Sequence, residues 1–261
     1  MHAKIPFSTI NALYYINFKT MEGEQQTQTS KKQFLSMPVA IVIAGVLIAG
    51  ALYLKGPTGG SLAAVNQFQA QKKEAKIDPV TDADHILGNP GALVKMIEYS
   101  DTECPFCKNF HGVLQQIMND YGKDGQVAWI YRQFPIEQLH SKAPHEAEAT
   151  ECAGELGGKA KFWDYLNEVF SRTNSNNSLD VAELPKIAKD IGLDVAAFNN
   201  CLSSGKYTKF ISDSVAKAQL AGAQGTPYTV IIDKDGNTYP INGYVPYTEF
   251  KSVIDGLLKG N

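Results

Sequence analysis

The distribution of apolar and polar residues divides this chain into three regions. Residues 1–37 are mostly polar and have no apolar face to bury, whereas residues 38–54 read PVAIVIAGVLIAGALYL and carry no charge. An uncharged apolar run of this length is at the short end of what spans a bilayer. From about residue 80 onward, short apolar runs alternate with stretches of helical period. The pattern predicts a disordered tail, a membrane segment and one folded domain.

The lysines around the apolar segment predict its orientation. Lys31 and Lys32 precede it, and a positive bias of this kind favours the cytoplasmic side, so residues 1–37 are expected to be a cytoplasmic tail. Residues 38–54 are interpreted as a single-pass anchor of the cell membrane, although Ala49-Gly50-Ala51 also resembles a signal-peptide cleavage site. A flexible linker over 55–79 is then expected to lead to an extracytoplasmic domain.

The domain over 80–261 is predicted to begin with a strand, a helix and a second strand. Residues 93–99 and 127–131 are short apolar runs, and apolar side chains recur at helical spacing from Cys107 to Tyr121. A strand, helix and strand in this order predict a parallel pair with a right-handed crossover. His85, just before the first run, is expected to lie in an exposed turn.

Helical periodicity dominates residues 143–222, where glycines separate the predicted helices. Gly157-Gly158 is expected to end the first helix of this block. Strand character returns at 228–232 and around 238–241, and a last helix is predicted over 248–258. The chain is therefore predicted to have an α/β fold that is interrupted by a helical block.

Two cysteines lie at the junction of the first strand and its helix. Cys104 is predicted at the helix N-terminus, where unpaired N–H groups and the helix dipole favour a thiolate, and Cys107 follows one turn later as the resolving partner. A redox pair of this kind needs no metal or organic cofactor. A structural disulfide or a metal-binding or metal-delivery domain is the alternative, with His111 at helical spacing from Cys107 as a further ligand.

Charge and cysteine count narrow the range of functions. The formal net charge is −3 and no basic cluster exceeds two adjacent lysines, which argues against nucleic-acid binding. All four cysteines follow residue 100, and an even count after an apolar segment indicates an oxidising compartment. Cys152 and Cys201 both fall on predicted helices of the block, and we predict that they form a structural disulfide. Two separately buried free thiols are the alternative.

A second motif, Gly225-Thr226-Pro227, stands directly before a predicted strand, where proline suits a tight turn. With Cys104-Pro105-Phe106-Cys107, Phe162-Trp163 and the order of elements, this motif makes residues 80–261 resemble the DsbA-like thiol:disulfide oxidoreductases. These proteins have a thioredoxin fold that a helical domain interrupts at this position. The resemblance covers the whole predicted domain.

The resemblance implies roles for three residues besides the cysteines. Pro227 would follow a cis peptide bond beside the cysteine pair, and Thr226 would offer backbone groups to an extended substrate segment. Glu98, six residues before Cys104, falls where these proteins carry a buried acid that exchanges protons with the resolving cysteine. An exposed strand carboxylate is the alternative interpretation of Glu98.

The implied activity is disulfide formation in exported proteins that carry free thiols. A reductase or an isomerase of the same fold remains an alternative. Members of the family are re-oxidised by a membrane quinone-linked partner, and the resemblance implies such a partner here. The membrane anchor would hold the domain near it.

Overall fold

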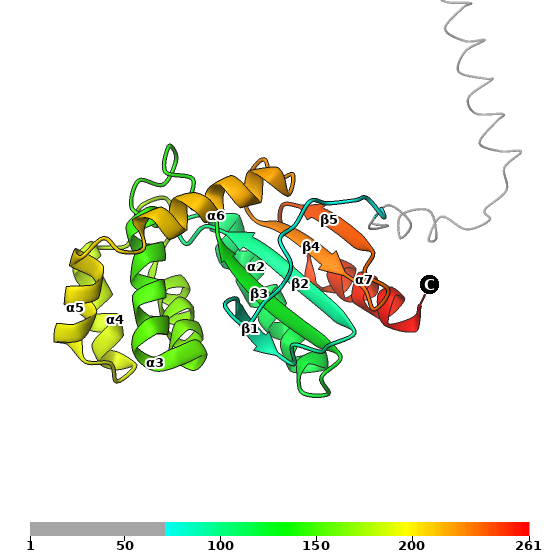
Figure 1. Ribbon diagram of the computed structural model, residues 1–261, viewed down its shortest axis with the longest axis horizontal. Coiled ribbons are helices and arrows are strands. Elements are labelled where there is room, and N and C mark those ends of the chain that lie inside the picture. The colour runs from blue at the N-terminus through cyan, green and yellow to red at the C-terminus, as the bar shows by residue number, and fades with distance from the viewer. Residues whose placement is uncertain (1–70, 261) are drawn as a thin grey trace, which may run out of the picture. The chain divides into compact units, whose positions relative to one another are not determined.

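The structure is a computed structural model, and it describes residues 71–260 (Figure 1). The predicted tail over 1–37 and the predicted membrane segment over 38–54 lie outside the described residues. Within 71–260, none of the helices combines the length and the apolar character that crossing a membrane requires.

A five-stranded sheet forms the centre of the described domain, with the strands in the order β1-β3-β2-β4-β5. β2 and β3 are parallel, and every other neighbouring pair is antiparallel. The predicted strand–helix–strand unit is confirmed, because the helix α2 connects the parallel pair. The strands are β1 (His85–Gly88), β2 (Val94–Ser100), β3 (Val127–Gln133), β4 (Tyr228–Ile232) and β5 (Thr238–Asn242).

Alternate side chains of the central strands enter two different cores. Met96 and Trp129 pack against α2 (Pro105–Ile117) and α7 (Tyr247–Lys259) on one face of the sheet. Ile97 and Ile130 point to the other face, which α6 (Thr208–Leu220) and residues 75–80 cover. Because both faces are covered, the strands are buried along almost their whole length.

The inserted helical block has its own core, beside the sheet in Figure 1. It comprises α3 (Ala143–Arg172), the short 3-10 turn Val181–Glu183, α4 (Leu184–Asp190) and α5 (Val195–Ser203), and α6 leads back to the sheet. α3 is interrupted at Gly158, whose φ of 75° is a left-handed value that glycine adopts without a steric penalty. The predicted break at Gly157-Gly158 is therefore present as a kink.

Cys152 of α3 and Cys201 of α5 are joined by a disulfide within the core of this block. Their Cα atoms lie 5.9 Å apart, an ordinary separation for a bridge. The pairing is the one that the cysteine count predicts, and it connects two helices that are 49 residues apart in sequence.

The expectation for His85 is wrong. His85 begins β1, an edge strand that the sequence pattern does not predict, and its side chain is only 17% exposed. Its ring stacks on Phe162 at a centroid distance of 3.4 Å, and its Nε2 lies 2.7 Å from Glu151 Oε2. A four-residue strand is too short to show an alternating pattern, so the neighbouring turn residues dominate the sequence signal.

Candidate active site

Cys104 is the N-cap residue of α2, with extended φ and ψ values of −78° and 122°. Pro105 follows at the first helical position, where a missing N–H leaves no hydrogen bond unmade. The Cys104 carbonyl accepts the first helical hydrogen bond, from Lys108 N at 3.0 Å. The sequence therefore fixes the sulfur of Cys104 at the positive end of the helix dipole.

The surroundings of Cys104 stabilise a thiolate. A hydrogen bond from the Cys107 thiol, opposed by burial and aided by Thr226 and by the backbone N–H groups of Cys107 and Phe106, lowers the pKa of Cys104 to about 6. Cys104 is buried, whereas Phe106, two residues further along the chain, is 58% exposed.

Cys107 has the opposite character. It is fully buried one turn into α2, and burial together with the neighbouring Cys104 and Glu98 raises its pKa well above the ordinary value. Its Sγ lies 3.5 Å from the backbone N of Asp101. In the structure both cysteines are free thiols. Because their pKa values are shifted in opposite directions, Cys104 ionises readily and Cys107 retains its proton.

Glu98 is completely buried on β2, on the face that packs against α2. Its Oε2 accepts a hydrogen bond from Trp129 Nε1 at 3.0 Å, and its Oε1 has no partner among residues 71–260. Burial raises the pKa of Glu98 to about 8, an effect that Ser100 and Trp129 oppose and that the charge of Cys104 reinforces. The interpretation of Glu98 as an exposed strand carboxylate is wrong.

The loop before β4 brings Thr226 and Pro227 to the cysteine pair. The Thr226–Pro227 bond is cis, and the Cys104 thiol lies 3.5 Å from the Thr226 carbonyl oxygen, which accepts from it. Pro227 is buried and Thr226 is half-buried. Cys104, Cys107, Glu98 and this loop therefore form one site, and Cys152–Cys201 lies apart from it in the helical block.

The family model described as thioredoxin matches residues 80–255, about two thirds of the chain. The chain belongs to the thioredoxin family. Pseudomonas aeruginosa DsbA2 is similar in structure, with 28% identity and a TM-score of 0.57 over 69% of this chain and 98% of that protein. Wolbachia pipientis alpha-DsbA1 is similar at 27% identity and a TM-score of 0.60, over 69% of this chain and 94% of that one.

Within the thioredoxin family, the chain resembles the DsbA-like thiol:disulfide oxidoreductases. In sequence it is 30% identical over 153 residues to Na(+)/H(+) antiporter NhaA 1 of Mycolicibacterium gilvum, strain PYR-GCK. The match covers 58% of this chain and 23% of the antiporter, so the chain spans less than a quarter of the curated relatives it matches. The antiporter's name describes that longer protein.

Two acidic residues that the sequence analysis overlooks hold the thioredoxin-like strand-to-helix turn in place. Asp101 Oδ1 accepts from Glu103 N at 2.8 Å, and its Oδ2 lies 2.9 Å from His140 Nδ1. The Glu103 carboxylate accepts from Thr173 and from two backbone N–H groups of residues 178 and 179. Both acids lie in the segment Ser100-Asp101-Thr102-Glu103, and their position directly before Cys104 is the sequence feature that predicts a role at this turn.

His111 does not lie in a set of metal ligands. Its Nε2 is 2.8 Å from Asn167 Oδ1, and burial lowers its pKa to about 4. Across the part of the chain that the structure describes, no three histidine, cysteine or acidic side chains come close enough to hold a metal ion.

Proposed function

We propose that this chain is a thiol:disulfide oxidoreductase that works as an oxidase and forms disulfides in exported proteins. The observation that carries the proposal is the contrast within the pair, since the pKa of Cys104 is lowered to about 6 and that of Cys107 is raised. A stabilised Cys104 thiolate favours the reduced form of the enzyme, and a pair that prefers to be reduced oxidises its substrates.

The reaction transfers two electrons from two substrate thiols to the Cys104–Cys107 disulfide. A substrate thiolate attacks Cys104 Sγ, the enzyme disulfide breaks, and Cys107 leaves as a thiolate. A second substrate thiolate then attacks the substrate sulfur of the mixed disulfide. The bond to Cys104 breaks, the substrate disulfide forms, and Cys104 leaves as the thiolate that its position at the helix N-terminus stabilises.

Glu98 is proposed as the acid that protonates Cys107. With a pKa of about 8, its carboxyl group is mostly protonated at neutral pH, and the Cys107 thiolate binds a proton more tightly still. The proton therefore moves downhill from Glu98 to Cys107 as the disulfide opens. Removing the charge of the Cys107 thiolate also discourages it from re-forming the enzyme disulfide.

The loop at Thr226 and Pro227 is proposed to hold the substrate. The carbonyl oxygen of Thr226 already accepts from the Cys104 thiol, so it lies within reach of any chain bonded to that sulfur. An extended substrate segment would pair with the backbone here as an added strand does. The exposed ring of Phe106 would supply apolar contact on the other side of the sulfur.

Membrane attachment and re-oxidation belong to the same proposal. The uncharged run at 38–54 supports a single-pass anchor with the catalytic domain outside the cytoplasm. The likeness to DsbA proteins supports substrate proteins with free thiols and a redox partner, for which we propose a quinone-linked membrane protein. The anchor would keep enzyme and partner in the same membrane.

The reduction potential of the Cys104–Cys107 pair tests the direction of catalysis. The full-length chain is equilibrated with glutathione buffers, and the reduced fraction is measured by thiol alkylation and mass shift. We expect a potential between the about −180 mV of protein disulfide isomerase and the about −120 mV of DsbA. A value near the −270 mV of thioredoxin would make the enzyme a reductase and overturn the proposal. The Cys152→Ser/Cys201→Ser variant, with the same active-site pair, is the matched control.

A further inference from the structure

Three polar side chains stand in one row across the sheet. Tyr131 of β3 is the register partner of Glu98 on β2 and of His85 on β1. Neighbouring strands lie about 4.8 Å apart, and paired residues of this register project to the same face. The row therefore runs from the acid beside Cys107 to the edge of the sheet.

The inner end of the row consists of buried polar atoms that lack hydrogen-bond partners within residues 71–260. They are Glu98 Oε1, Ser100 Oγ and Tyr131 OH. Ser100 lies two residues beyond Glu98 on β2, so its side chain projects to the same face of the sheet as Glu98. Buried polar atoms normally bond to protein or to water, so two unpaired hydroxyls beside an unpaired carboxyl oxygen mark a place with a task other than packing.

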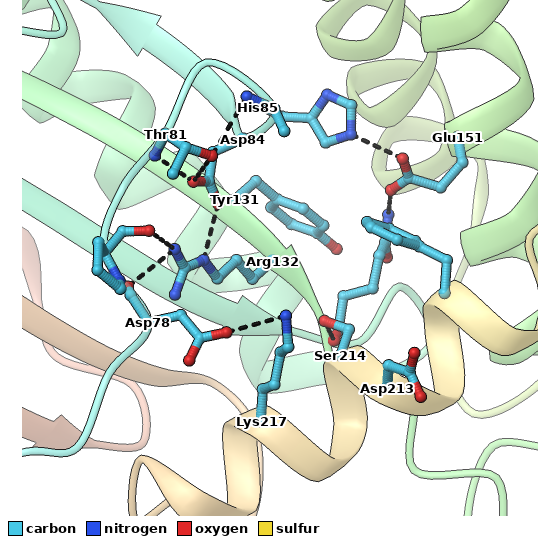
Figure 2. Close-up of a pocket in the computed structure, with 14 residues that line it drawn as sticks. Asp78, Thr81, Asp84, His85, Tyr131, Arg132, Glu151, Asp213, Ser214 and Lys217 are labelled. Carbon is cyan, nitrogen blue, oxygen red and sulfur yellow. Dashed lines mark hydrogen bonds and ion pairs between the residues drawn. The ribbon is translucent and has the colours of Figure 1, made fainter.

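The outer end of the row opens into a cavity of about 360 Å³ at the β1 edge (Figure 2). Tyr131 and His85 line this cavity, and the His85 ring points at Glu151 from α3. Glu151 also accepts from Gln133 Nε2 at 3.0 Å. Phe210 on the cavity wall is 48% exposed, so the cavity reaches the surface of the domain.

We propose that the row Glu98–Tyr131–His85, continued by Glu151, conducts protons between the buried acid at Cys107 and solvent in this cavity. Tyr131 is the positioning residue in the middle of the route, and Ser100 bridges it to Glu98. The proposal rests on the proposed role of Glu98 as the proton donor to Cys107. It adds the path by which Glu98 recovers its proton while α2 covers it from the active-site side.

The proton balance of the route involves no electron transfer. After Glu98 has given its proton to the Cys107 thiolate, the Tyr131 hydroxyl donates toward the Glu98 carboxylate through Ser100 and accepts a proton from the His85 side. One proton enters from the cavity for each one that Glu98 releases. Tyr131 stays neutral throughout, because burial and the nearby charges of Glu98, Cys107 and Asp101 raise its pKa well above the ordinary value.

A rapid pH jump from 7 to 9 on the reduced full-length chain tests the route, with tryptophan fluorescence as the readout. The chain has two tryptophans, and Trp129 donates its indole N–H to Glu98 while its ring lies tilted against that of Trp163, with the centroids 4.7 Å apart. Cys104 is already ionised at pH 7, and Cys107 retains its proton at pH 9. The fluorescence change that disappears in Glu98→Gln therefore reports the release of the proton from Glu98.

We expect Tyr131→Phe to slow this phase on the order of a hundredfold or more, as the loss of a positioned proton-transfer group does. His85→Gln, which interrupts the row on the other side of Tyr131, is expected to slow it as well. Tyr165→Phe removes a buried hydroxyl that donates to the Leu184 carbonyl in the helical block, and it should relax at the wild-type rate.

The outcomes separate the route from the role of Glu98. A wild-type relaxation rate in Tyr131→Phe would overturn the route and leave Glu98 as the acid. A fluorescence phase that persists unchanged in Glu98→Gln would overturn both the acid and the route. A merely structural hydroxyl would alter the melting temperature of Tyr131→Phe without altering the relaxation rate, and that result would also refute the proposal.

Discussion

Cys104 and Cys107 lie at the start of one helix, whereas Cys152 and Cys201 join the middle of one helix to another. The first pair has a helix N-terminus, the buried acid Glu98 and the Thr226–Pro227 loop around it. The second pair is packed among Tyr165, Val169, Phe198 and other side chains of the helical-block core. Both pairs are buried, so burial alone does not make a cysteine pair reactive.

The comparison locates reactivity in the backbone around the sulfur. Backbone N–H groups at the start of α2 point toward Cys104, and they are available because a helix leaves its first N–H groups unpaired. Cys152 and Cys201 lie inside helices whose N–H groups are already bonded to earlier carbonyls. A cysteine at the helix N-terminus is therefore stabilised as a thiolate, whereas a cysteine inside a helix is suited to a structural disulfide.

The largest expected effect is on activity. Cys104→Ser should abolish oxidation of a dithiol peptide, since no other sulfur of the pair is placed to accept the substrate thiolate. Cys152→Ser/Cys201→Ser should retain the wild-type turnover at a temperature where the domain is folded. The measurement is the rate of disulfide formation in the peptide. Loss of turnover in the folded double variant would abolish the distinction between the two pairs.

The next largest effect is on the pH dependence of stability. It comes from Glu98, which lies beside Cys104 and Cys107 and not beside Cys152 and Cys201. Its pKa is raised to about 8 in the folded chain, so the folded state holds a proton that the unfolded state releases above its ordinary value near 4.5. The contribution of Glu98 to the free energy of unfolding is therefore fully present below about pH 4.5, and it is lost as the pH rises toward and through 8. The full shift corresponds to about 5 kcal/mol.

Glu98→Gln should remove this loss, so the variant should gain stability over the wild type between pH 5 and pH 9. Urea unfolding at several pH values measures the difference. Glu146, whose pKa burial raises in the same direction to about 8, is present in both chains and cancels in the comparison. A pH-independent difference between the two chains would mean that Glu98 titrates normally.

The smallest of the three effects is on the stability of the helical block. Opening the Cys152–Cys201 bridge frees a loop across a separation of 49 residues. The chain-entropy model assigns a loop of this length about 4 kcal/mol. Cys152→Ser/Cys201→Ser should lose up to that amount in urea unfolding, with the Cys104–Cys107 pair as the internal control. An unchanged midpoint would show that the bridge adds nothing to the packed core around it.

Much of the fold could be predicted from the sequence, because apolar runs and helical periods are local features. The strand before Cys104, the helix start at Pro105 and the kink at Gly158 all follow from residues near them. Edge strand β1 could not be predicted, because its four residues become a strand only by pairing with β3. Its pairing depends on residues at least forty positions away.

The site was predictable in its cysteines and much less so in its surroundings. The motif Cys104-Pro105-Phe106-Cys107 at a predicted helix start favours a redox pair, but the burial of Glu98 depends on how α2 lies over the sheet. The row through Tyr131 depends on strand register, which no short stretch of sequence contains. His140 reaches Asp101 from a loop for which the sequence offers no signal.

The segment before the sheet has a mechanical consequence. Lys73 N donates to the Thr238 carbonyl, the Thr238 hydroxyl donates to the Lys73 carbonyl, and Ala75 N donates back to that hydroxyl. Tension arriving along the chain from its N-terminal side is therefore borne first by these bonds to β5. They lie at the far edge of the sheet from β1, and two strands separate β5 from β3. A pull on the chain would therefore break the hydrogen bonds to Thr238 at the β5 edge before it disturbed the alignment of Glu98 with Tyr131.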